Sequence, residues 1–238
     1  MQGPIFLISI VGISALPVVI TSLYIKHTYS SINLWYILST LAIGVLSLFV
    51  GSMLQLFLPI STNTTRLSLL YNVFIRNAFI EEVGRLIAFW LMLVMVPIIG
   101  PSSAVLQTLR MHTSRELMIY RGILAGFMFA MIENLSYGLL SLELIIIRTV
   151  TSAFLHAACS ARIALAVYYG WSASASTHSP SNIGKALFYG IGAILIHGIY
   201  NLMLLSSSAF VVIPIALAFI ALASILALTK MDRKDSIS

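Results

Sequence analysis

Long apolar runs constrain what this chain can fold into. Of its 238 residues, 60% are hydrophobic and 8% are charged, and the mean hydropathy is +1.03, a balance that soluble domains do not have. A helix crosses the hydrocarbon layer with about 20 apolar residues, and the bilayer offers no partners to free backbone groups. The sequence therefore predicts an all-α, polytopic transmembrane bundle of about seven spans. The runs cover residues 4–25, 34–58, 71–99, 117–140, 144–171, 186–205 and 210–229.

The polar breaks between these runs are too short to hold a separate soluble domain, so we expect one integral membrane domain over residues 1–238. Residues 1–60 contain two spans without ionisable side chains, and we expect them to be scaffold. Residues 71–205 are expected to form a core of four helices that carries the polar site. Residues 206–238 would supply the last span and a basic tail.

The basic residues predict how the chain lies in the membrane, because short loops rich in Lys and Arg stay in the cytoplasm. With seven spans, Arg66 is nearly alone on one side, so we expect the amino terminus outside and the carboxyl terminus in the cytoplasm. The net charge of +6 is then mostly a topology signal with some attraction to anionic lipid, and it does not indicate nucleic acid as a partner. The residues expected on the cytoplasmic side are Lys26, Arg110, Arg115, Lys185, Lys230, Arg233 and Lys234.

A charged stretch interrupts the third run, where residues 76–85 read R-N-A-F-I-E-E-V-G-R. A charge at bilayer depth costs about 3 kcal/mol, so such groups face a bundle interior or a hydrated cavity. Glu81 and Arg85 are four residues apart and can pair on one helix face, while Glu82 is rotated by about 100° and is expected to point elsewhere. One glutamate would then be anchored and the other free. The alternative interpretation is an ion pair that only fixes helix packing.

The next three runs also carry polar residues spaced four apart, which places each set on one helix face. The sets are Phe129, Glu133 and Tyr137; Arg148, Ser152, His156 and Ser160; and His197 and Asn201. Four consecutive helices thus bring ionisable groups to a comparable depth, which independent packing residues need not do. We therefore predict one shared site at mid-depth or in the outer half of the membrane.

Carboxylate and imidazole groups in a buried, wet site are suited to activating water by general acid–base catalysis. Hydrolysis of an amide also needs donors for the developing oxyanion, and His197 with Asn201 would fit that role. Alternatively, His156, His197 and Glu133 resemble a catalytic zinc shell with an open position, although the sequence contains no H-E-x-x-H motif that would specify one. Serine chemistry is disfavoured because no G-x-S-x-G elbow occurs.

Four motifs, in order on successive helices, resemble the PrsW family of intramembrane proteases. They are E-E-V-G-R at 81–85, F-A-M-I-E at 129–133, R-T-V-T-S-A-F-L-H at 148–156 and H-G-I-Y-N at 197–201. That family is similar to the CAAX prenyl endopeptidases, the bacteriocin-processing enzymes and the Aph-type subunit of γ-secretase. The resemblance covers residues 76–205. Arg85 stands where the family usually has lysine, and Asn201 stands where it often has aspartate.

The resemblance implies an intramembrane protease of the bacterial plasma membrane. It would cleave a single-span, membrane-anchored regulator such as an anti-sigma factor, in a site-1-type cut at the extracytoplasmic side. Residues 71–205 would be its catalytic core.

Carried over by position, Glu81 or Glu82 would activate water with help from Glu133 or His156. His197 and Asn201 would steady the tetrahedral intermediate, while Arg85 and Arg148 hold carboxylates in place. Which glutamate is the base, and whether the enzyme uses zinc or no cofactor, stay open at this point.

Two other classes of function compete with the protease. Similar polar residues can stabilise a non-enzymatic scaffold that recruits partners, as in the Aph-type relative. Glu and His chains also build proton relays in transporters. Against a proton-coupled transporter, the hydropathy pattern shows no internal repeat and no matched pair of helices broken by Gly or Pro.

Overall fold

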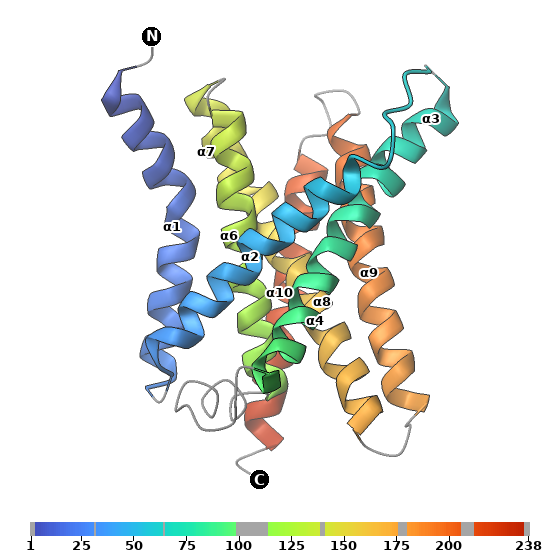
Figure 1. Cartoon of the computed structure of the whole chain (residues 1–238). Helices are drawn as coiled ribbons and strands as arrows, with labels where there is room; N and C mark the ends of the chain where they lie inside the picture. Colours follow the sequence, from blue (N-terminus) through green and yellow to red (C-terminus); the bar gives the residue numbers. More distant parts are fainter. Residues whose placement is uncertain are drawn as a thin grey trace.

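The chain folds into a bundle of helices, seen in a computed structural model (Figure 1). The structure describes residues 3–30, 32–63, 65–98, 114–138, 141–175, 180–205 and 212–235. Within these ranges there is no β-strand, so the predicted all-α membrane bundle is confirmed.

Each predicted span corresponds to one helix or to consecutive helical segments. The elements are α1 (Pro4–Thr28), α2 (Leu34–Gln55), α3 (Arg66–Leu70), η1 (Tyr71–Phe79), α4 (Ile80–Ile98), α6 (Arg115–Gly138), α7 (Leu142–Val150), α8 (Ser152–Ala175), α9 (Pro180–Leu204) and α10 (Val212–Asp235). Five segments are long and apolar enough by themselves to cross a membrane: α1, α2, Leu142–Ser172, α9 and Val212–Lys230. The remaining two long helices, α4 and α6, carry Glu81, Glu82, Arg85 and Glu133.

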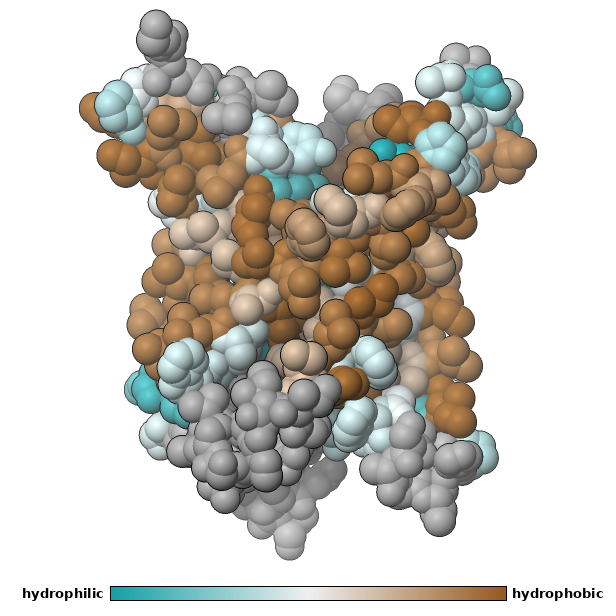
Figure 2. All heavy atoms as spheres, viewed as in Figure 1, coloured by the Kyte–Doolittle hydropathy of each residue, from teal (hydrophilic) through white to brown (hydrophobic). Residues whose placement is uncertain are grey.

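The helices run back and forth between two ends of the bundle, and the chain termini lie at opposite ends (Figure 1). In Figure 2, hydrophobic side chains cover the middle of the visible face and hydrophilic ones gather toward its two ends. Large apolar side chains are strongly exposed, including Ile5 at 80% and Phe188 at 72%. Such a surface suits hydrocarbon, and the protein is an integral membrane protein.

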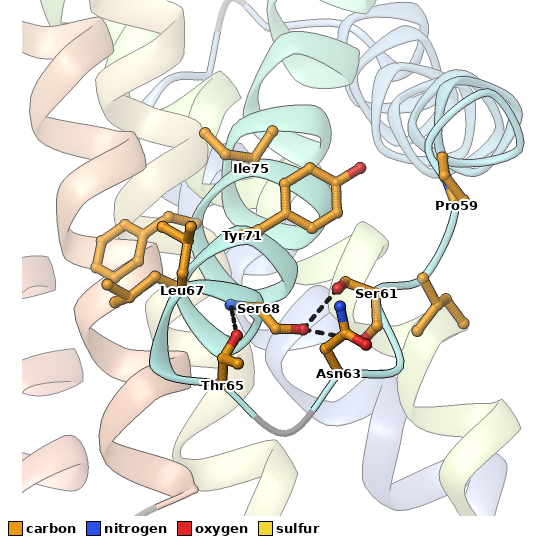
Figure 3. Close-up of a pocket in the computed structure, with 11 residues that line it drawn as sticks. Pro59, Ser61, Asn63, Thr65, Leu67, Ser68, Tyr71 and Ile75 are labelled. Carbon is orange, nitrogen blue, oxygen red and sulfur yellow. Dashed lines mark hydrogen bonds between the residues drawn. The ribbon is translucent and has the colours of Figure 1, made fainter.

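The loop between α2 and α3, described over residues 56–63 and 65 and called the tied loop below, leads the chain toward the helix that carries the site. Thr65 caps α3 by accepting from the Ser68 N–H at 3.2 Å, and Ser68 Oγ donates to Ser61 Oγ at 2.6 Å (Figure 3). Asn72 holds the same loop residue, since its Nδ2 donates to Ser61 O at 2.8 Å. The loop is therefore fixed against the start of η1.

Two glycines allow the helices around the site to approach closely. A Cβ at Gly126 on α6 would lie 2.6 Å from Ala157 Cα on α8, and one at Gly84 on α4 would lie 2.8 Å from Gly51 N on α2. Only a residue without a side chain permits such backbone contact, as is common between membrane helices. The close approach of α6 and α8 places Glu133 beside His156.

Candidate active site

Arg85 lies at the centre of the polar residues, and its side chain is completely buried. It donates through Nη1 to Glu82 Oε1, and its Nη2 lies 3.6 Å from Glu81 Oε2. Its guanidinium carbon is 4.1 Å from the centre of the Phe129 ring. The expectation that Glu82 points away from Arg85 is therefore wrong. Glu82 is the anchored carboxylate, with no exposed side-chain surface, and Glu81 is the freer one, with 16% exposed.

The contact between Glu82 and His197 determines which nitrogen of that imidazole is available. His197 Nδ1 lies 2.7 Å from Glu82 Oε1, so an ionised Glu82 accepts and Nδ1–H donates. In a neutral ring, Nε2 then carries the lone pair, and this atom lies 3.8 Å from Glu81 Oε2. A neutral His197 so arranged cannot donate a hydrogen bond to an oxyanion through Nε2. Its geometry suits a metal ligand or a proton acceptor instead.

His156 connects Arg85 to the residues of α6 and α7. Its Nδ1 accepts from Arg85 Nη2 at 2.7 Å, because a guanidinium can only donate. Its Nε2 lies 2.9 Å from Glu133 Oε2, the same oxygen that Arg148 Nη2 approaches at 2.8 Å. The rings of His156 and His197 are 5.2 Å apart. One connected network therefore joins side chains of several helices: Glu81, Glu82, Arg85, Glu133, Arg148, His156 and His197.

The predicted stripe on α6 also holds, because each of its members contacts a cation or an imidazole. Phe129 packs against Arg85 and His156, Glu133 pairs with Arg148, and Tyr137 lies under Arg148 with 3.8 Å from guanidinium carbon to ring centre. Arg148 thus pairs with a carboxylate, as expected.

The stripe from Arg148 to Ser160 is interrupted, because Thr151 has φ −122° and ψ −73° between α7 and α8. Ser160 is buried and does not line the cavity described next.

A cavity of about 660 Å³ borders this network. Glu81, Glu133, His156, His197 and Asn201 all line it, whereas Glu82 and Arg85 lie behind its wall. The helices α4 and α8 run away from the end of the bundle where the chain begins, and Glu81 and His156 lie early in them (Figure 1). The helices α6 and α9 run toward that end, and Glu133 and His197 lie late in them. The cavity therefore lies in the half of the bundle nearer the amino-terminal end.

Several cavity residues were missed in the sequence. Arg76 and Asn77 from η1 reach the wall, and α2, expected only as scaffold, contributes Ser52 and Gln55. The α2 residues belong to a run without charges, so only the tertiary packing brings them to the site. A larger pocket of about 860 Å³ lies between the tied loop, α3 and η1 (Figure 3). Among the described residues, its lining contains no acidic group and no histidine, so it offers no comparable chemistry.

The same residues fit a divalent metal ion. Glu81, His156 and His197 offer ligand atoms that all lie within 4.8 Å of one another, and two histidines with one carboxylate match a catalytic zinc shell. To bind the metal, His156 would exchange its hydrogen bond with Arg85 or with Glu133 for the metal. Glu81 Oε2 is buried without a hydrogen-bond partner. The pair of Glu82 and His197 is of the kind that orients metal-bound histidines. The predicted ligand set had Glu133 in place of Glu81; the structure places Glu133 on Arg148 and His156 instead.

Comparison with known proteins agrees with this geometry. A family model described as PrsW family intramembrane metalloprotease matches residues 32–229. Comparisons with curated proteins and with solved structures gave no match. The family match spans α2 to α10 and includes every residue of the polar network. The chain therefore belongs to the PrsW family of intramembrane metalloproteases.

Proposed function

We propose that this protease hydrolyses a peptide bond in a single-span, membrane-anchored regulatory protein, in the manner of a site-1 cleavage of an anti-sigma factor. The observation that carries the proposal is the cavity that brings Glu81, His156 and His197 together. The cavity lies in the half of the bundle nearer the amino terminus, and the basic residues predict that the amino terminus lies outside the cell. This position suits a cut at the extracytoplasmic side.

We assign to Glu81 the contact with the attacking water, because the residue lines the cavity and its Oε2 lacks a hydrogen-bond partner. Glu81 accepts a proton while the water oxygen bonds to the carbonyl carbon. The carbonyl oxygen becomes an oxyanion, and the side-chain amide of Asn201 on the same cavity wall donates to it. The C–N bond then breaks as Glu81 returns the proton to the leaving nitrogen, which gives a carboxylic acid and an amine.

The other charged residues hold this arrangement in place. Arg85 lies between Glu82 and His156 and fixes both, and Glu82 fixes the orientation of His197. Arg148 and His156 meet at Glu133 and keep that carboxylate engaged, which leaves Glu81 as the freest carboxylate at the cavity. These positioning roles explain why Arg85 and Arg148 do not need to touch the substrate.

Glu81, His156 and His197 would hold a divalent metal, such as zinc, which would supply positive charge beside the attacked carbonyl. Glu81 would bind the metal through one carboxylate oxygen and accept the proton of water at the other. We therefore expect protein purified without chelators to contain about one metal ion per chain, measured by inductively coupled plasma mass spectrometry. Replacing a ligand, as in His197→Asn, should lower metal affinity at least ~10-fold. Chelation should stop cleavage of a membrane-anchored peptide in liposomes, and zinc should restore it.

The matched control is His27→Asn, which removes an exposed histidine from the last turn of α1, outside the cavity. This variant should keep the metal and the activity of the wild type. Full activity in metal-free protein would contradict the metal site and leave the glutamate route. A lack of cleavage by intact, metal-loaded wild type, across a panel of single-span peptides, would contradict the proposed function itself.

A further inference from the structure

We propose that Arg76 forms a subsite that binds an acidic side chain of the substrate, about two residues from the scissile bond on the side nearer the amino-terminal end. This inference rests on the proposed function and adds a specificity to it. It follows from the contacts of Arg76, from the helix that carries it and from the charges around the cavity.

Arg76 is the cavity arginine that has no carboxylate partner among the residues that the structure describes. Its Nε donates to Leu58 O at 3.2 Å, and its Nη1 lies 3.5 Å from Asn77 Oδ1. Arg148, the other arginine of the cavity wall, is bound to Glu133. A guanidinium has five N–H donors, so the two contacts of Arg76 leave donors free at the cavity.

The unusual helix before α4 brings Arg76 to this position. On an α-helix, residues five apart are turned well away from each other, since one turn takes 3.6 residues. Tyr71–Phe79 instead forms a π-helix of nine residues, in which hydrogen bonds run from i to i+5. Arg76 and Glu81 therefore both line the cavity. Long π-helices are rare, and single π-turns are frequent at functional sites.

The neighbours of Arg76 hold its backbone without neutralising its charge. Gln55 Nε2 donates to Arg76 O at 3.3 Å, and the Leu58 carbonyl that receives Nε belongs to the tied loop. Gln55 and Asn77 are neutral, whereas the carboxylates Glu81 and Glu133 lie elsewhere on the wall. A negative group on the substrate would therefore be attracted to Arg76 and repelled from the two glutamates.

The distance between Arg76 and Glu81 sets where the acidic residue would lie. Five residues rise about 7.5 Å on an α-helix, which is an upper limit for the wider and shorter π-helix, and an extended peptide covers this distance in about two residues. Arg76 lies on the amino-terminal side of Glu81 in the direction of the helix axis. A glutamate or aspartate there can accept two parallel hydrogen bonds from the guanidinium, a strong and orienting contact.

The test uses pairs of single-span fluorogenic peptides in liposomes. The two peptides of a pair differ only at one position, which is Glu in one and Gln in the other. Different pairs place this position at each of the four residues on either side of the cut. The wild type should cleave the Glu peptide about tenfold faster than its Gln partner, by kcat/KM, at a position about two residues from the bond. Arg76→Gln should abolish this preference, so that the variant cleaves the Glu and Gln peptides at rates within about twofold of each other. Arg76→Glu should reverse it in favour of a Lys peptide.

The ratio between paired peptides separates recognition from a purely structural role, because a damaged fold would slow both members alike. Arg66→Gln is the matched control, since it removes an exposed arginine outside the cavity, and it should keep the tenfold ratio. Equal cleavage of both peptides by the wild type at every position would overturn the subsite and leave the protease intact. Cleavage of neither peptide by the wild type would instead count against the proposed function.

Discussion

Replacing Glu81 with Gln should lower kcat for cleavage of a membrane-anchored peptide by about 10³-fold and leave the bundle folded. The amide keeps the size of the side chain but cannot accept the proton of the attacking water, and positioned general bases contribute about 10²- to 10⁴-fold. The Oε2 of Glu81 has no hydrogen-bond partner, and the ion pair that the substitution removes, with Arg85 at 3.6 Å, is longer than the contact that Arg85 keeps with Glu82. The measurement is steady-state cleavage in liposomes, with folding checked by circular dichroism.

Glu143→Gln is the control for the loss of one negative charge, because Glu143 is exposed in the first turn of α7 and lies outside the cavity. It should cleave like the wild type. If Glu81→Gln retained more than about a tenth of the wild-type kcat, Glu81 would not be the group that activates water.

Replacing Arg85 with Met should lower the free energy of unfolding by about 3–5 kcal/mol, the largest stability effect expected in this chain. The change leaves Glu82 buried and without its cation, and such an unpaired buried charge is costly. It also removes the contacts of Arg85 with His156 and Phe129. The measurement is unfolding of the purified protein in mixed micelles of increasing sodium dodecyl sulfate content.

Arg66→Met provides the control, since the same substitution at an exposed position should change stability by less than about 0.5 kcal/mol. The double variant Glu82→Gln, Arg85→Met should be more stable than Arg85→Met alone, because it removes the unpaired carboxylate as well. Equal stability of Arg85→Met and the wild type would show that the buried pair does not hold the bundle together.

Much of this architecture could be predicted because membrane solvation leaves few choices. Apolar runs of about 20 residues must be helices in a membrane, so the positions of these runs in the sequence predict the spans from α1 to α10. The polar stripes gave the convergence of Glu81, Glu133, His156 and His197, since steps of four residues place side chains on one helix face.

The remaining features depend on tertiary contacts that helical spacing does not encode. Glu82 rather than Glu81 is the closest partner of Arg85, because α9 brings His197 against Glu82 from the other side. The same contact makes a neutral His197 unsuitable as an oxyanion donor, a conclusion that needs the hydrogen bond to be seen. Arg76 was missed because the spacing rules assume 3.6 residues per turn, and η1 does not follow them.

The most direct test of the shared site is to map the cleavage of a single-span peptide by mass spectrometry, using purified protein in liposomes prepared in ¹⁸O-labelled water. For the wild type we expect a cut in the half of the span nearer the amino-terminal end of the protease, with ¹⁸O in the new carboxylate. Glu81→Gln, His156→Asn and His197→Asn should each yield almost none of this product. Unchanged cleavage at the same bond by all three variants would contradict hydrolysis in this cavity.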